Sequence, residues 1–205
     1  MAINFTDGLR HLYVAGLNSV TNQSNNSLRV WLNKGNFILE PKDVDVFELS
    51  IFNPSDFLST LAFDINRLSI ASVETIANMD YETKTPKFLA WKLVNYYYSA
   101  FFSAHSILKV LGFGLVQIDD RIVAQLKQRA ASYGFGDAVI SRGIYCFSIS
   151  KSAKVVFYKV DKYSDSHKGL WNRFADLLDV LNAKAVLTGK YDSTCVVKKQ
   201  NLKYR

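Results

Sequence analysis

The sequence predicts a mainly α-helical protein, a helical bundle with an inserted β-hairpin, with an α+β class as the alternative. Three segments, at 86–111, 119–133 and 166–183, have helical hydrophobic periodicity. A fourth, at 138–160, is rich in β-branched and aromatic residues. Apolar residues make up 49% of the 205-residue chain and aromatic residues 14%, enough to form a core.

The first 80 residues predict short helices joined by polar loops. Helices are expected at 7–20 and 28–33, separated by the loop signal TNQSNNS. The segment VDVFELSI at 44–51 alternates like a strand but could equally open a helix, and Pro54 interrupts it before helical spacing resumes. Residues 1–80 are therefore expected to form an N-terminal helical layer, either separate or part of the main domain.

The segment 86–111 predicts a long helix, capped by Thr85 and ended by Gly112, with Pro86 at its first position. Its polar residues form one narrow stripe: Lys92, Asn95, Ser99, Ser103, Ser106 and Lys109. The rest of its circumference is apolar, so the helix should be largely buried or paired with another copy. We assign the aromatic runs at 96–98 and 101–102 to the core rather than to a base-stacking platform.

The remaining elements complete a predicted helical-bundle domain at 81–183. An amphipathic helix is expected at 119–133, with acidic residues in its first turn and Gly134 at its end. The β-hairpin at 138–160 follows, and then a helix that starts near Ser166 and ends near Ala183. The sequence of residues 184–205 is too irregular to predict a helix or a strand.

Charge is distributed unevenly along the chain. Residues 1–150 contain 13 basic and 13 acidic side chains, whereas residues 151–205 contain 12 basic and 5 acidic, so the whole net charge of +7 lies in the last 55 positions. Such a region suggests contact with phosphate or with an acidic partner, or an ordinary solvated tail. The candidate nucleic-acid-binding residues are Lys184, Lys190, Lys198, Lys199, Lys203 and Arg205.

Several strong motifs are absent from the sequence. The two cysteines, Cys146 and Cys195, have no metal-ligand spacing, and no phosphate loop, GxSxG elbow or HExxH motif occurs. No metal and no cofactor are therefore expected. The chain also lacks a secretory signal pattern and an apolar run of membrane-spanning length, so we expect a cytoplasmic protein that does not contact a membrane.

The three histidines differ in their surroundings. We expect His11 to be a surface residue. His105 lies opposite the polar stripe, so we expect it to be a core residue. His167 lies in the first turn of the last helix, beside Lys168 and before Arg173. A neutral imidazole near cations could act as the base in attack on phosphate, although a structural role is favoured.

Two segments together resemble the HEPN family, helical domains of prokaryotic toxin–antitoxin and antiviral systems. They are YYSAFFSAHSILKVLG at 97–112 and SHKGLWNRFADLL at 166–178. Active members of the family cleave RNA without metal through an Arg-x4–6-His motif shared across a dimer. Here no arginine precedes His105 or His167 at that spacing, and Phe102 stands where the family pattern often has histidine. The resemblance therefore implies a degenerate member.

We expect a non-catalytic HEPN-like subunit or regulator of a defence or toxin-type complex. It would bind a protein partner or a second copy, and its basic C-terminal region would contact RNA or DNA. One alternative is a metal-independent ribonuclease that uses His167 as the base and Lys168 and Arg173 as the stabilising cations. The other is a nucleic-acid-binding protein that acts alone, with salt-dependent affinity.

Overall fold

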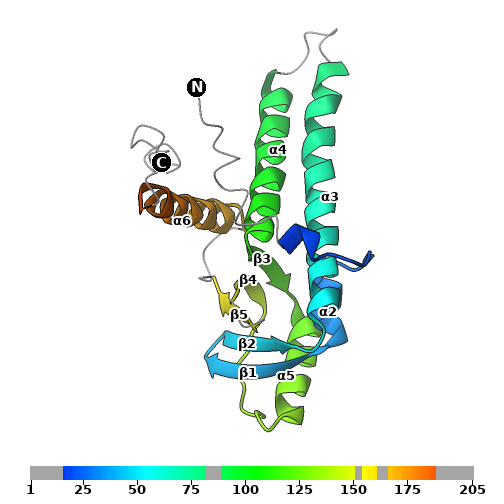
Figure 1. The fold of residues 1–205 in the computed structure, drawn as a ribbon, viewed down its shortest axis with the longest axis vertical. Coiled ribbons are helices and arrows are strands. Elements are labelled where there is room, and N and C mark those ends of the chain that lie inside the picture. Colours follow the sequence, from blue (N-terminus) through cyan, green and yellow to red (C-terminus); the bar gives the residue numbers. More distant parts are fainter. Residues whose placement is uncertain (1–15, 82–88, 151–153, 161–165, 188–205) are drawn as a thin grey trace.

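The computed structural model describes residues 16–81, 89–150, 154–160 and 166–187. These residues form an α+β fold, in which a five-stranded antiparallel sheet has helices on both faces and a long helical hairpin extends beyond it (Figure 1). The predicted bundle is thus confirmed only in part, since the sheet is as much a part of the framework as the helices.

Strands far apart in the chain build the sheet. In spatial order they are β1 (Phe37–Asp43), β2 (Val46–Ile51), β5 (Lys154–Lys159), β4 (Gly143–Ile149) and β3 (Phe113–Ile118). The predicted hairpin at 138–160 is confirmed as the antiparallel pair β4–β5. It is no insertion, however, because β5 pairs with β2 and occupies the centre of the sheet. Strands from residues 1–80 and from residues 81–183 therefore share one sheet.

Alternating side chains place two cores on the two faces of the sheet. The first core lies under α2 (Leu28–Lys34), α5 (Asp120–Ser132) and the start of α3 (Pro54–Tyr81). Its largest side chains are Trp31, Phe37, Phe47, Phe57, Tyr145, Phe147 and Phe157. The second core lies under the end of α4 (Leu89–Val110) and under α6 (Ser166–Leu187), and its buried residues are Ala104, Leu108, Leu115, Cys146, Leu170, Leu177 and Leu181.

The sequence predicted α2, α5 and α6 well, but not the 28-residue α3, because only short helices were expected in residues 1–80. The helices expected at 28–33, 119–133 and 166–183 correspond to α2, α5 and α6. Asp119 caps α5 by accepting from the Ile122 amide, and Gly112 follows α4 with a φ of 81°. The helix expected at 7–20 lies mostly outside the described residues, as does the start of the helix expected at 86–111.

Helices α3 and α4 form the antiparallel hairpin, and serines join them. The Ser72 hydroxyl lies 2.7 Å from the Ser103 hydroxyl and 3.0 Å from that of Ser99, and Ser69 lies 2.8 Å from Ser106. Small hydroxyl side chains let the two backbones approach closely while each polar group finds a partner. With 28 residues, α3 is roughly 40 Å long, so its far half extends well away from the sheet (Figure 1).

Helix α4 packs against α3 through its polar side, which is the reverse of what its hydropathy suggests. The polar stripe is the buried seam, because Ser99, Ser106 and Lys109 are all less than 10% exposed. Much of the apolar circumference is instead open, including Trp91 at 57% exposure and Leu93 at 60%. Hydropathy alone assigned the polar side to solvent. The serines are buried because α3 supplies matching serines, which the periodicity of a single helix cannot reveal.

Candidate functional site

The predicted catalytic candidate His167 is held in an aromatic cluster where α6 crosses α4. Its ring stacks on Phe101 with 4.4 Å between centroids, and its Nδ1 lies 2.7 Å from the Tyr97 hydroxyl. The Trp171 indole N–H donates to the same hydroxyl oxygen at 3.2 Å. When Tyr97 accepts from Trp171 and donates to His167, the imidazole proton resides on Nε2. These contacts give His167 a packing role between two helices.

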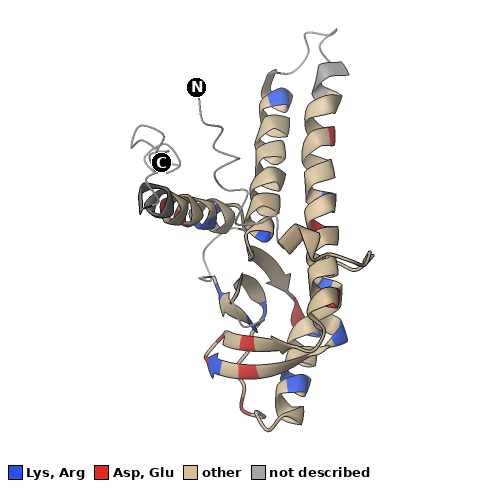
Figure 2. Ribbon diagram, in the orientation of Figure 1, with Lys and Arg blue, Asp and Glu red and all other residues tan. Residues whose placement is uncertain are grey.

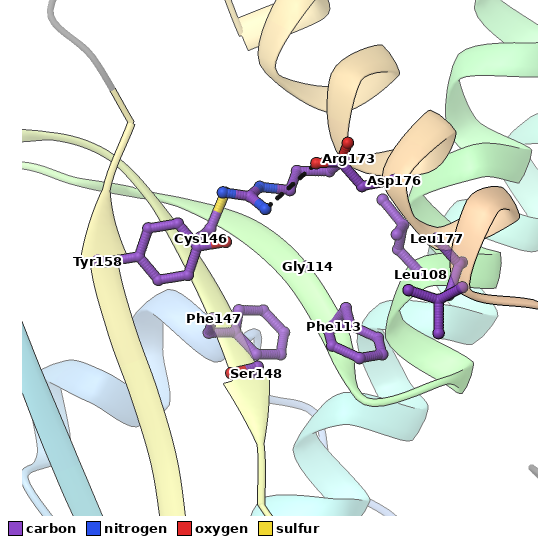
Figure 3. Close-up of a pocket in the computed structure, with 11 residues that line it drawn as sticks. Leu108, Phe113, Gly114, Cys146, Phe147, Ser148, Tyr158, Arg173, Asp176 and Leu177 are labelled. Atoms are coloured by element: carbon purple, nitrogen blue, oxygen red, sulfur yellow. Dashed lines mark hydrogen bonds and ion pairs between the residues drawn. The ribbon is translucent and has the colours of Figure 1, made fainter. Parts of the chain in front are cut away.

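The other two candidate catalytic residues face different surroundings. Arg173 extends from α6 towards the sheet, with its guanidinium carbon 4.7 Å from the centre of the Tyr158 ring and Nη1 3.4 Å from Asp176 (Figure 3). Lys168 is exposed. Six residues of helix also place His167 and Arg173 ~120° apart around the axis of α6. The arrangement therefore does not favour a shared catalytic centre within one chain.

A pocket of about 230 Å³ separates α6 from the sheet (Figure 3). Arg173 stands at its edge above Cys146 and Tyr158, and Leu108 and Phe113 line its apolar wall. Burial raises the pKa of the Cys146 thiol, and burial also raises the pKa of Tyr158 to about 12. Both groups are therefore protonated near neutral pH, and a protonated thiol is a poor nucleophile. The pocket is suited to packing or to holding a small ligand rather than to thiol chemistry.

A second pocket, of about 330 Å³, lies between α2, α3, α4 and β3. At its base, the Lys109 ammonium lies 2.6 Å from Asp64 Oδ2, and both side chains are less than 10% exposed. Asp64 Oδ1 is buried without a hydrogen bond from the described residues. Burial and the nearby charge of Lys109 lower the pKa of His105 to about 4, so this imidazole is neutral at pH 7. His105, which was predicted to be a core residue, is partly buried, and its ring packs against Phe101.

A third polar network fastens the β1–β2 turn to the sheet. Asp45, with a φ of 57°, accepts hydrogen bonds from the Ser141 amide and hydroxyl and from the Tyr145 hydroxyl, at 2.7–2.8 Å. Lys159 contacts both Asp45 and Ser141. Burial alone would raise the pKa of Asp45, but the hydrogen bonds from Tyr145 and Ser141 outweigh it and lower that pKa. This network holds the central and edge strands together.

The α3–α4 hairpin exposes apolar side chains on both of its helices. We define its heptad flank by seven exposed apolar residues: Ile70, Val73 and Ile76 of α3 and Leu89, Leu93, Tyr96 and Ile107 of α4. On α4 these residues belong to the series 89, 93, 96, 100, 103 and 107, whose alternating steps of four and three mark a coiled-coil seam. That spacing is visible in the sequence and could have identified the flank.

Both helices contribute to the same side of the hairpin. We measured positions around each helix axis at ~100° per residue, starting from the inward-facing serines. Val73 on α3 and Leu93 on α4 are both displaced from the serines in the same rotational sense. In an antiparallel pair, equal senses of rotation lead to the same side of the pair. Trp91, Val94 and Tyr98 turn the opposite way and form what we define as the tryptophan flank, also exposed.

The hairpin carries few charges. Glu74 is the sole charged residue between positions 68 and 78, and Lys92 is the sole one between positions 89 and 108. Figure 2 shows the contrast with the sheet and α5, where charged positions are numerous.

The predicted basic region falls largely outside the described residues. Lys190, Lys198, Lys199, Lys203 and Arg205 lie there, as do Cys195 and His11. Lys184 lies within α6.

Within the part of the chain that the structure describes, no cluster of three or more histidine, cysteine or acidic residues could hold a metal ion. None of the described helices has the length and apolar character needed to cross a bilayer. No family model, no curated protein and no solved structure matches this chain.

Proposed function

We propose that this protein is a non-catalytic binding subunit that docks another protein surface through its α3–α4 hairpin. The observation that carries the proposal is the set of exposed apolar residues on both helices of that hairpin, which includes Leu89 at 75% exposure and Val73 at 66%. Soluble monomers rarely expose apolar patches larger than a few hundred Å², and larger ones mark sites of protein interaction. The low charge of the same helices favours an apolar partner.

The non-catalytic part of the proposal is supported by the contacts of the candidate nuclease residues. His167 is engaged by Tyr97 and Phe101, while Arg173 pairs with Asp176 over Tyr158. A general base needs to reach the proton that it abstracts. The two side chains contact different residues, so the ribonuclease alternative has no specific geometric observation in its favour.

The resemblance to HEPN proteins remains part of the proposal. The segments 97–112 and 166–178 that carry it pack against each other through the Tyr97–His167 contact and the stacking of Phe101 on His167. We therefore retain a degenerate HEPN-like role in a prokaryotic defence or toxin-type complex as the biological setting. Contact of the basic region at 151–205 with RNA or DNA is a further element of this proposal.

The test of docking is site-specific photo-crosslinking in cells that carry the native gene. A photoreactive amino acid replaces Leu93 on the hairpin or, as the control, the exposed Lys127 on α5. We expect a crosslinked product of defined mass from position 93 that disappears when Val73→Glu is added. Equal crosslinking at both positions, or none at position 93, would overturn the proposal.

The test of catalysis is incubation of the purified chain with labelled RNA and DNA in EDTA at two salt concentrations. We expect intact nucleic acid, with any gel shift weakening as salt rises. Metal-independent cleavage that is lost in His167→Ala but retained in Lys127→Ala would favour the ribonuclease instead.

A further inference from the structure

We infer that the occupant of the heptad flank is a second copy of this chain, so that two α3–α4 hairpins form an intermolecular four-helix bundle. This inference rests on the proposed docking function and names its partner. The tryptophan flank lies on the other side of each hairpin and is not part of the contact.

The first argument is the angle between the two faces of each helix. In a four-helix bundle every helix contacts two neighbours, one within its hairpin and one across from it, in directions roughly at right angles. Here the serine seam occupies the first direction. On both helices, the heptad flank is centred ~90° from that seam, counted at ~100° per residue. The hairpin therefore has the geometry of half a bundle.

The second argument is chemical self-complementarity. A two-fold interface brings the same patch of each subunit together, so it must contain no like charges that would meet across the axis. The heptad flank contains no charged residue, and its aliphatic side chains pack well against copies of themselves. Ala100 of the same α4 series is exposed and small enough to let the facing helices approach.

The third argument is area. The seven side chains of the flank are on average a little over half exposed. With on the order of 150 Å² for each apolar side chain of this size, they offer on the order of 600 Å² per subunit before any rim residues are added. A stable interface of standard size buries ≈ 800 Å² per partner. The flank is thus large enough to carry most of such an interface.

The experiment measures the mass of the full-length chain in solution by sedimentation equilibrium across a hundredfold range of concentration. Leu93→Glu places a charge on the heptad flank, and Val94→Glu places the same charge on the neighbouring residue of the tryptophan flank. Val73→Glu repeats the test from α3. Circular dichroism and thermal unfolding establish that each variant is folded.

We expect a dimer for the wild type and for Val94→Glu, and at least a tenfold weaker dimer for both Leu93→Glu and Val73→Glu. A wild type that stays monomeric over the whole range would overturn the inference, as would folded Leu93→Glu that dimerises normally or equal weakening by Val94→Glu. If the chain is monomeric but position 93 crosslinks to a different protein, the proposed docking function stands and only the identity of the partner is wrong.

Discussion

Replacing Lys109 by methionine should destabilise the fold strongly, because it leaves a buried carboxylate without its ion-pair partner. The Lys109 ammonium lies 2.6 Å from Asp64 Oδ2, and the two side chains are 7% and 5% exposed. Arg67 reaches the other carboxylate oxygen only at 3.6 Å, from a side chain that is 64% exposed. Loss of one member of a buried ion pair costs roughly 3–5 kcal/mol, since the remaining charge stays desolvated. We therefore expect Lys109→Met to lower the free energy of unfolding by about that amount.

Urea unfolding, followed by tryptophan fluorescence at a fixed protein concentration, measures the change. Lys92→Met, the same replacement elsewhere on α4, is the control and should change stability by less than about 1 kcal/mol. The double variant Asp64→Asn with Lys109→Met removes both charges and keeps an acceptor for the Leu28 amide, which donates to Asp64 at 3.4 Å. It should recover most of the loss. A cost below about 1 kcal/mol for Lys109→Met, or a double variant no more stable than the single one, would refute the reasoning.

Three further predictions concern pH dependence and packing. The pKa of His105 falls from 6.5 to about 4 on folding. The unfolded chain therefore takes up the proton first, so the free energy of unfolding decreases as the pH falls from 6.5 towards 4, by up to about 3 kcal/mol. In His105→Gln, the free energy of unfolding should change less with pH across that window. The pKa of Asp45 is lowered in the fold, so its contribution is present above its unfolded value near 3.8 and is lost in more acidic solution. Asp45→Asn should therefore reduce stability at pH 7 more than at pH 2.5, and equal losses at both would contradict the network with Tyr145. A Cβ at Gly114 would lie 2.7 Å from the Phe147 ring, so Gly114→Ala should lower the melting temperature, at a cost of about 1–3 kcal/mol, whereas an unchanged value would show that the ring can move aside.

The candidate site shows where sequence patterns were sufficient. The last helix was expected to start near Ser166, and α6 does begin there, because an N-cap signal and a hydrophobic stripe are local properties. His105 was expected in the interior because it lies opposite the polar stripe, but that stripe is the buried seam, and His105 is only partly buried. The catalytic trio of His167, Lys168 and Arg173 was assembled from closeness in sequence. Closeness along a helix does not give a shared direction, and two of these side chains contact different elements.

The sequence by itself determined the positions of α2, α5 and α6, and which faces of α5 and α6 are apolar. It also determined the β4–β5 hairpin, since caps, turns and periodicity all act over a few residues. Only the tertiary structure decided that residues 37–51 complete the sheet and that the serines of α4 face inward. Both depend on a partner segment distant in the chain, because β2 becomes a strand by pairing with β5 and the serines are buried by pairing with those of α3. For the same reason, the apolar residues left over by that serine seam form the surface that another protein can cover.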